Sequence, residues 1–315
     1  MKKTLALLLA LVMAIGLTAC GTTLTMATGG TSGTYYGFSS VVANVLNEKL
    51  GDTLNVTVQS TGASAANIDL IDTGANQLAI VQNDVMYYAY NATDMYQGKD
   101  PITSYSAVMS CYPEYVQIIA NESITSIDQL KGKKVSVGDA GSGVEFNARQ
   151  ILAAYGIDID KDINKNNQSF ADSADSLKNG TIDAAFIVAG YPTTAVSELA
   201  STYKFNILPI DQEHAKDLMK QYGFYTYGVI PGGTYSCVAD DVPAVAVMAT
   251  IIARNDVSED QIYTMVKGIF DNQADITAGH VKGAELSVDT AVTGIDIPFH
   301  PGAQKYFVEV GAMSE

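Results

Sequence analysis

A glycine-rich turn occurs in each half of the chain, directly after a strand-like run and before a helical pattern. The first turn spans residues 28–36 (TGGTSGTYY) after the run 23–27 and contains no acid or base; the second spans 138–143 (GDAGSG) after the run 134–137. Such turns offer backbone N–H groups and hydroxyls to a ligand. One turn in each half predicts two lobes that close on one small molecule.

Strand-like and helical patterns alternate along the chain. The expected strands include residues 54–58, 78–81, 115–120, 134–137, 184–188, 205–209 and 244–253, with helical patterns between several of them. This alternation predicts an α/β fold with a mostly parallel, doubly wound arrangement.

Two crossings between the lobes are expected. The segment 110–114 precedes an apolar strand, after which the pattern of the N-terminal half starts again. We therefore predict lobe 1 over residues 20–112, lobe 2 over 113–246 and a return to lobe 1 over 247–315. Two crossing segments form a hinge, which suits closure around a ligand.

The N-terminus has the pattern of a lipoprotein signal peptide over residues 1–19. Lys2 and Lys3 precede the uncharged apolar run 4–17, and Cys20 follows Ala19 and precedes Gly21. Cleavage before Cys20 predicts an exported protein, lipid-anchored to the outer face of the cytoplasmic membrane or periplasmic. The alternative is an ordinary signal peptide with a cysteine at its cleavage site.

The charge balance narrows the class of partner. Without Lys2 and Lys3 the chain has 16 basic and 34 acidic residues, a net charge of −18. This sign argues against nucleic acid and anionic lipid surfaces as partners. A solvated acidic surface is the simpler interpretation of the same balance.

Two further cysteines, Cys111 and Cys237, lie far apart in the sequence. Two unpaired, largely buried thiols are the favoured expectation. A second hypothesis is that the two approach each other and lock the hinge when oxidised.

Candidate ligand contacts gather where loops lead into helices, because ligands of parallel α/β sheets sit beyond the carboxyl ends of the strands. The tyrosines among them offer apolar walls with polar tips. The predicted contacts are Gly30, Thr31, Gly33, Thr34, Tyr36, Ser64, Gln82, Asp84, Ser142, Gly143, Glu145, Gly190 and Tyr191.

The charged residues near these turns favour an amino acid as the ligand. Free helix N-termini suit a carboxylate or a phosphate. The sequence has only two arginines, Arg149 and Arg254, and their positions give no evidence of a bidentate arginine that binds an anion. Asp84 and Glu145 stand where they can meet a ligand ammonium group. For either acid alone, complementing a helix dipole is an equal alternative.

No enzyme motif is evident. The sequence contains no G-x-S-x-G, H-E-x-x-H, complete P-loop or G-x-G-x-x-G pattern, and its three histidines have no metal-ligand spacing. The expectation is a binding protein without catalytic residues, bound metal or cofactor.

Several short motifs, in this order and spacing, resemble those of the TAXI family of solute-binding proteins. They are the segments 29–36, 61–64 with Asn67, 80–84, 112–114, 128–133, 137–143, 180–186, 190–192, 230–235 and 300–303. Val144, Asn147 and Cys111 depart from the residues that are usual in that family.

The resemblance implies a two-lobed type II periplasmic-binding-protein fold with two hinge crossovers. It also implies a receptor that delivers a small carboxylate, glutamate or a related amino acid first, to the membrane permease of a TRAP (tripartite ATP-independent periplasmic) transporter. Glutamine and 2-oxoglutarate stay open as ligands. The alternative functions are a sensory input module for a histidine kinase or chemoreceptor and, less favoured, an exported enzyme on the same fold.

Overall fold

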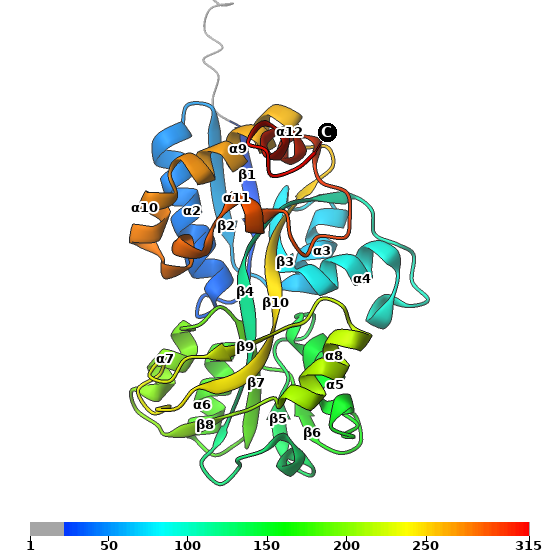
Figure 1. The fold of residues 1–315 in the computed structure, drawn as a ribbon, viewed down its shortest axis with the longest axis vertical. Helices are drawn as coiled ribbons and strands as arrows, with labels where there is room; N and C mark the ends of the chain where they lie inside the picture. Colours follow the sequence, from blue (N-terminus) through cyan, green and yellow to red (C-terminus); the bar gives the residue numbers. More distant parts are fainter. Residues whose placement is uncertain (1–21, 315) are drawn as a thin grey trace, which may run out of the picture.

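The computed structural model describes residues 22–314 and consists of two α/β lobes stacked along the long axis of the molecule (Figure 1). Two long strands, β4 (Tyr105–Asn121) and β10 (Val242–Arg254), run through the junction and connect the lobes. The two α/β lobes and the two crossings between them are those that the sequence predicts.

Lobe 1 begins with strands and helices in alternation. Helix α2 follows the first glycine-rich turn, and helices α3 and α4 follow the next two strands. The elements are β1 (Thr22–Ala27), α2 (Thr34–Leu50), β2 (Leu54–Gln59), α3 (Ser64–Asp72), β3 (Leu78–Gln82), α4 (Asn83–Asn91) and the 3₁₀ turn η1 (Asp94–Tyr96).

Strands and helices also alternate in lobe 2, which follows strand β4. Helix α5 follows the second glycine-rich turn. The elements are η2 (Ile127–Leu130), β5 (Lys134–Ser136), α5 (Val144–Ala154), β6 (Asn164–Asn166), α6 (Phe170–Lys178), β7 (Ala184–Ala189), α7 (Thr194–Ala200), β8 (Phe205–Leu208), α8 (Gln212–Gln221) and β9 (Thr226–Ile230).

The chain returns to lobe 1 through β10 and ends there in a group of helices. Helix α9 starts with a capping box, in which Ser258 and Gln261 satisfy each other's backbone N–H groups. The returning elements are α9 (Glu259–Asp271), α10 (Gln273–Gly279), η3 (Val281–Glu285), α11 (Val288–Ala291) and α12 (Pro301–Glu309).

The two crossing strands pair with each other across the junction. Pro113 lies opposite Met248, and the register shifts between Ala249 and Thr250. The expected crossings at residue 113 and at 246–247 fall inside these two continuous strands.

The sheet is mixed, which corrects the expectation of a mostly parallel arrangement. Strands β2, β1 and β3 are parallel in lobe 1, as are β6, β5 and β7 in lobe 2. The crossing strands β4 and β10 pair antiparallel with their neighbours. A buried strand is an apolar run in either direction, so the sequence pattern does not show this difference.

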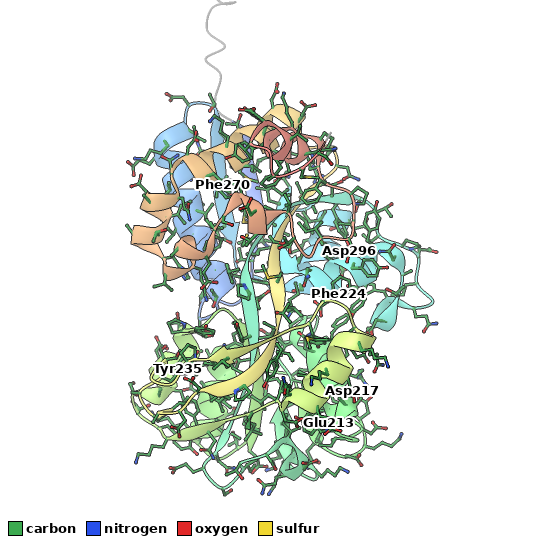
Figure 2. All side chains as sticks on the ribbon, in the orientation of Figure 1. Glu213, Asp217, Phe224, Tyr235, Phe270 and Asp296 are labelled. Atoms are coloured by element: carbon green, nitrogen blue, oxygen red, sulfur yellow. The ribbon has the colours of Figure 1, made fainter. Side chains whose placement is uncertain are left out.

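Each lobe is stabilised by a hydrophobic core of its own. One cluster packs α2, α9 and α12 against the lobe 1 sheet, and another packs α5 and α8 against the lobe 2 sheet. At the junction Phe224 lies between the lobes (Figure 2), with its ring 5.1 Å from that of Tyr87 in α4. Each lobe therefore has its own core, and aromatic contacts join the two at one edge.

Cys111 and Cys237 are both free thiols, as in the favoured expectation, and the disulfide of the second hypothesis is not formed. Cys111 belongs to the lobe 1 core, whereas Cys237 packs against a cluster of lobe 2. Cys20 and the expected signal peptide lie outside the described residues. Within residues 22–314, no helix combines the length and the apolar character needed to cross a membrane.

Candidate ligand-binding site

A cleft between the lobes contains a cavity of about 50 Å³. A cavity of this size has room for a few water molecules or part of a small ligand. In the part of the chain that the structure describes, no lysine or arginine lines it. The lining residues are Gly29, Gly30, Ser32, Gly33, Thr34, Tyr35, Ala63, Ser64, Gln82, Glu114, Asp139, Ser142, Gly143, Val144, Phe170, Val188 and Ala189.

Two helix N-termini open onto this cleft without a cap. Helix α2 begins after Gly33 and helix α5 after Gly143, and neither has a side-chain cap. By contrast, α8 and α9 are capped by Asp211 and Ser258. Uncapped first-turn N–H groups are unsatisfied donors with partial positive charge, so both helix ends suit an anionic group.

Helix α3 makes a closing contact on one side of the cleft. The backbone N–H groups of Ala65 and Ala66 in lobe 1 donate to the carbonyl of Gly141 in lobe 2, at 3.0 and 3.1 Å. This helix end is therefore satisfied by the opposite lobe and is not available to a ligand.

Helix α7 makes the corresponding contact on the other side. Ala195 N–H in lobe 2 donates to the carbonyl of Ser32 in lobe 1, at 3.2 Å. Thr34 Oγ1 donates to the carbonyl of Gly190, at 2.8 Å. The two glycine-rich turns thus hold the lobes together as well as line the cavity, and the structure is a closed form.

A buried lysine reinforces this second contact. Lys282 of η3 is 1% exposed, forms an ion pair with Glu285 and lies 4.6 Å from the centroid of the Tyr191 ring in lobe 2. A β-carbon on Gly190 would lie 2.6 Å from Lys282 Cε, so a larger residue at position 190 would displace the Lys282 side chain. Lys282 and Tyr191 form a cation–π contact between the lobes.

Two buried polar atoms at the cleft lack a partner. They are Gln82 Oε1 and Ser142 Oγ, on side chains of residues that are 2% and 3% exposed. Gln82 comes from lobe 1 and Ser142 from lobe 2. Buried polar atoms are rarely left without a hydrogen bond, so both indicate a place for ligand atoms.

Two carboxyl groups line the cleft that were not among the predicted contacts. Glu114, on β4, is 2% exposed and accepts a hydrogen bond of 2.7 Å from the Tyr35 hydroxyl. Burial raises the pKa of Glu114 well above its usual value, and burial also raises the pKa of Asp139. The signal available in the sequence was the position of Glu114 directly after the predicted crossing at residue 113.

The two acids proposed to meet a ligand ammonium group lie elsewhere. Asp84 is buried but is not a lining residue; its carboxylate accepts from Asn147 Nδ2, at 2.8 Å. Glu145 pairs with Lys165 and Arg149 outside the cavity lining. Although partial burial opposes it, hydrogen bonds from Lys165 and Asn167 lower the pKa of Glu145. Both acids already have partners that lie far away in the sequence, Asn147 for Asp84 and Lys165 for Glu145.

The other predicted contacts divide into two groups. Gly30, Gly33, Thr34, Ser64, Gln82, Ser142 and Gly143 line the cleft. Thr31, Tyr36, Gly190 and Tyr191 do not, although Gly190 and Tyr191 form closing contacts. Apolar lining residues such as Phe170 and Val188 were missed, because core and cleft positions of a strand or helix look alike in sequence.

The model of the NMT1-like family matches residues 26–311, nearly the whole chain. The chain belongs to the NMT1-like family. This NMT1-like protein also resembles solved binding proteins in fold. The alkanesulfonate-binding protein SsuA from Xanthomonas axonopodis pv. citri, bound to MOPS, has a TM-score of 0.51 and 14% identity, covering 91% of this chain and 83% of that one.

Two further structures show the same fold similarity to the NMT1-like protein. A binding protein component of an ABC phosphonate transporter from Pseudomonas aeruginosa has a TM-score of 0.53 at 13% identity, covering 83% and 79% of the two chains. A structure concerned with glutathione import via GshT and a cystine ABC importer of Streptococcus mutans has a TM-score of 0.52 at 14% identity, covering 90% and 99%. At these identities the similarity shows the fold alone.

Proposed function

We propose that this protein is an exported solute-binding protein that captures a small carboxylate, glutamate or a related amino acid first, by closure of its two lobes. The observation that carries the proposal is the closed cleft with two buried unpartnered atoms, Gln82 Oε1 and Ser142 Oγ, one from each lobe. A ligand that satisfies both atoms favours the closed form, because both lobes must be in place to bind it.

The cleft has chemistry for a carboxylate. The uncapped first turns of α2 and α5 provide N–H donors for a ligand. The first-turn N–H groups of α3 and α7 instead donate to carbonyl groups of the opposite lobe. Ser142 and Ser64 add hydroxyls. Because no lysine or arginine lines the described part of the cleft, these dipoles are the groups that would hold the carboxylate.

The cleft also has chemistry for an ammonium group. Glu114 and Gln82 Oε1 are acceptors, and Asp139 adds a second carboxyl group. This set replaces Asp84 and Glu145 in the role that the sequence suggested. Acceptors and uncapped helix ends in one small cavity suit a zwitterion better than a phosphate or a simple dicarboxylate.

The proposed partner is a membrane permease of the TRAP type. The resemblance in sequence motifs to the TAXI family supports it, as does the predicted lipoprotein signal that ends at Cys20. Solved proteins of this fold include a binding protein component of an ABC phosphonate transporter, which supports a membrane transporter as the partner but not its type. The lipid anchor would keep the receptor at the membrane surface that the permease occupies.

A ligand screen tests the proposal. Thermal unfolding is followed with the protein amino acids, dicarboxylates, sulfonates and inorganic phosphate, and calorimetry measures the affinity of each compound that stabilises. A binder at 100 times its Kd raises the free energy of unfolding by about 2.7 kcal/mol. Ser142→Ala should weaken that binder by about tenfold, because it removes a buried hydrogen bond. Ser201→Ala, at an exposed hydroxyl of the same lobe, is the matched control.

The screen separates the classes of ligand, and an uptake assay separates transport from sensing. Stabilisation only by phosphate or sulfonates would contradict an amino-acid ligand. A sensory input module would bind the same ligand, so transport needs its own assay. Uptake of the labelled ligand into vesicles that contain a TRAP permease, dependent on this protein, supports delivery; ligand binding without stimulated uptake favours sensing.

A further inference from the structure

Seven polar side chains form one hydrogen-bonded network at the junction of the lobes, next to the cavity. Four of its six hydrogen bonds join a residue of lobe 1 to a residue of lobe 2, so the whole network exists only in the closed form. Its members are Gln82, Asp84, Tyr88 and Asp94 from lobe 1, and Asn147, Gln150 and Tyr225 from lobe 2.

One carboxylate end of the network fixes the orientation of Asn147. Asp84 Oδ2 accepts from Asn147 Nδ2, at 2.8 Å, while Asp84 Oδ1 accepts from the N–H of Val85. An ionised carboxylate only accepts hydrogen bonds, so the amide nitrogen of Asn147 must face it. The carbonyl oxygen of Asn147 therefore points the other way.

The second carboxylate end gives the same orientation. Gln150 Nε2 donates to Asp94 Oδ2, at 3.2 Å, which leaves Gln150 Oε1 to accept from the Tyr225 hydroxyl, at 2.7 Å. The Tyr225 oxygen then accepts from Asn147 Nδ2, at 2.8 Å. Both ends of the network thus turn the same nitrogen of Asn147 away from the cavity.

The orientation of Asn147 fixes the orientation of the Gln82 side-chain amide. The outward carbonyl of Asn147, Oδ1, accepts from Gln82 Nε2, at 2.8 Å. Gln82 therefore has its nitrogen occupied and presents its oxygen, Oε1, which is buried at the cleft without a partner. A rotated Gln82 amide would place two carbonyl oxygens against each other, so the network holds one orientation.

We infer that Asp84 and Asn147 are positioning residues that lock Gln82 as a hydrogen-bond acceptor, and that the cleft consequently selects ligands with an N–H donor at that point, an ammonium group above all. Asp84 acts on the ligand through Asn147 and Gln82 rather than by contact. The inference rests on the proposed function and specifies which group of the ligand forms a hydrogen bond with Gln82.

The test compares a ligand with its counterpart that lacks the amino group. Calorimetry at pH 7.5 measures L-glutamate and glutarate on the wild-type protein, Asn147→Leu and Asp84→Asn. If another amino acid is the tightest binder of the screen, that amino acid and the acid without its amino group are used. The readout is the ratio of the two Kd values. A merely structural role would weaken both compounds together and leave the ratio unchanged.

The wild type should bind L-glutamate at least about tenfold more tightly than glutarate, because glutarate leaves a buried acceptor unpaired. Asn147→Leu frees Gln82 to turn, and Asp84→Asn supplies a donor that allows Asn147 to turn; each should reduce the ratio at least threefold. Asn76→Leu, which removes a buried asparagine at the other end of β3, is the control and should keep the wild-type ratio.

The outcomes are distinguishable. A wild type that binds no amino acid of the screen contradicts the proposed function and this inference with it. A wild type that prefers L-glutamate, with an unchanged ratio in both variants, overturns the inference alone. Tighter binding of glutarate than of L-glutamate by the wild type also overturns it. Because Asp84→Asn is nearly isosteric, it remains informative if Asn147→Leu does not fold.

Discussion

Gly143 in lobe 2 lies so close to the side-chain carbonyl of Gln82 in lobe 1 that any β-carbon at position 143 would overlap that oxygen. Gly143 has φ −69° and ψ −18°, a conformation that alanine adopts without strain. The glycine is therefore required by the approach of the two lobes, and not by its own backbone.

Gly143→Ala should prevent full closure while leaving each lobe folded. Overpacking of this kind costs about 1–3 kcal/mol, which corresponds to a roughly 5- to 150-fold loss in ligand affinity by calorimetry. Gly223→Ala is the control, because no atom lies within 4 Å of a β-carbon there. Equal affinities for the two variants would mean that the lobes do not meet at Gly143 when ligand is bound.

Tyr191→Leu should weaken every ligand by the same factor. Tyr191 does not line the cavity, and its ring faces Lys282 across the junction. Loss of one cation–π contact is expected to cost about 1 kcal/mol, or roughly fivefold in affinity. Tyr263→Leu removes a similar contact with Lys305 inside lobe 1 and should leave affinity unchanged. A loss confined to one ligand would instead mark Tyr191 as a direct contact.

Glu114→Gln should weaken amino acids more than acids that lack the amino group. Glu114 is a buried carboxyl group in the cleft, and the substitution keeps the acceptor for Tyr35 but removes the ability to ionise. We expect at least about tenfold weaker binding of L-glutamate and little change for glutarate. Glu213→Gln, on the outer helix α8 (Figure 2), is the control. Parallel losses for both compounds would argue against an ammonium partner at Glu114.

The stability of the protein should depend on pH through Asp84. Burial raises the pKa of Asp84 to about 6 from an ordinary 3.8, so the folded state holds this proton more tightly than the unfolded chain. The stability that protonation contributes is complete below pH 3.8 and is lost as pH rises through 6. The titratable groups facing Asp84 are Asp94, Tyr88, Tyr225 and Glu114.

Urea unfolding of the wild type and Asp84→Asn checks this sign. The free energy of unfolding of the wild type minus that of the variant should fall by about 2 kcal/mol between pH 4 and pH 7. Groups that titrate alike in the wild type and the variant, such as Glu114, contribute equally to both free energies of unfolding. Their contributions therefore cancel in the difference. A difference that rises with pH would show that Asp84 is stabilised as a carboxylate in the folded protein.

The sequence predicted the two-lobed fold because its features are local. A glycine-rich turn between a strand and a helix can be recognised from neighbours in the chain. Gly33, Ser64 and Ser142, which we predict to contact the ligand, line the cavity. The elements alternate as predicted, and the expected strand 205–209 is β8.

The remainder depended on distant pairings. Asp84 and Glu145 both lie in the first turn of a helix. Only the tertiary structure shows that Asn147 donates a hydrogen bond to Asp84 and that Lys165 forms an ion pair with Glu145. Glu114 lies inside a strand, where a single acid in an apolar run gives no sign of which side it faces. The use of the α3 and α7 N-termini by the opposite lobe is likewise invisible in a linear sequence.

A crystal structure of the protein with the tightest-binding amino acid of the screen would show where the ligand lies. We predict that it lies between the lobes, with its amino nitrogen within hydrogen-bond distance of Gln82 Oε1 and Glu114. Its carboxylate should lie at the first turns of α2 and α5. A ligand bound outside this cleft, or one whose carboxylate faces Gln82 Oε1, would contradict the account.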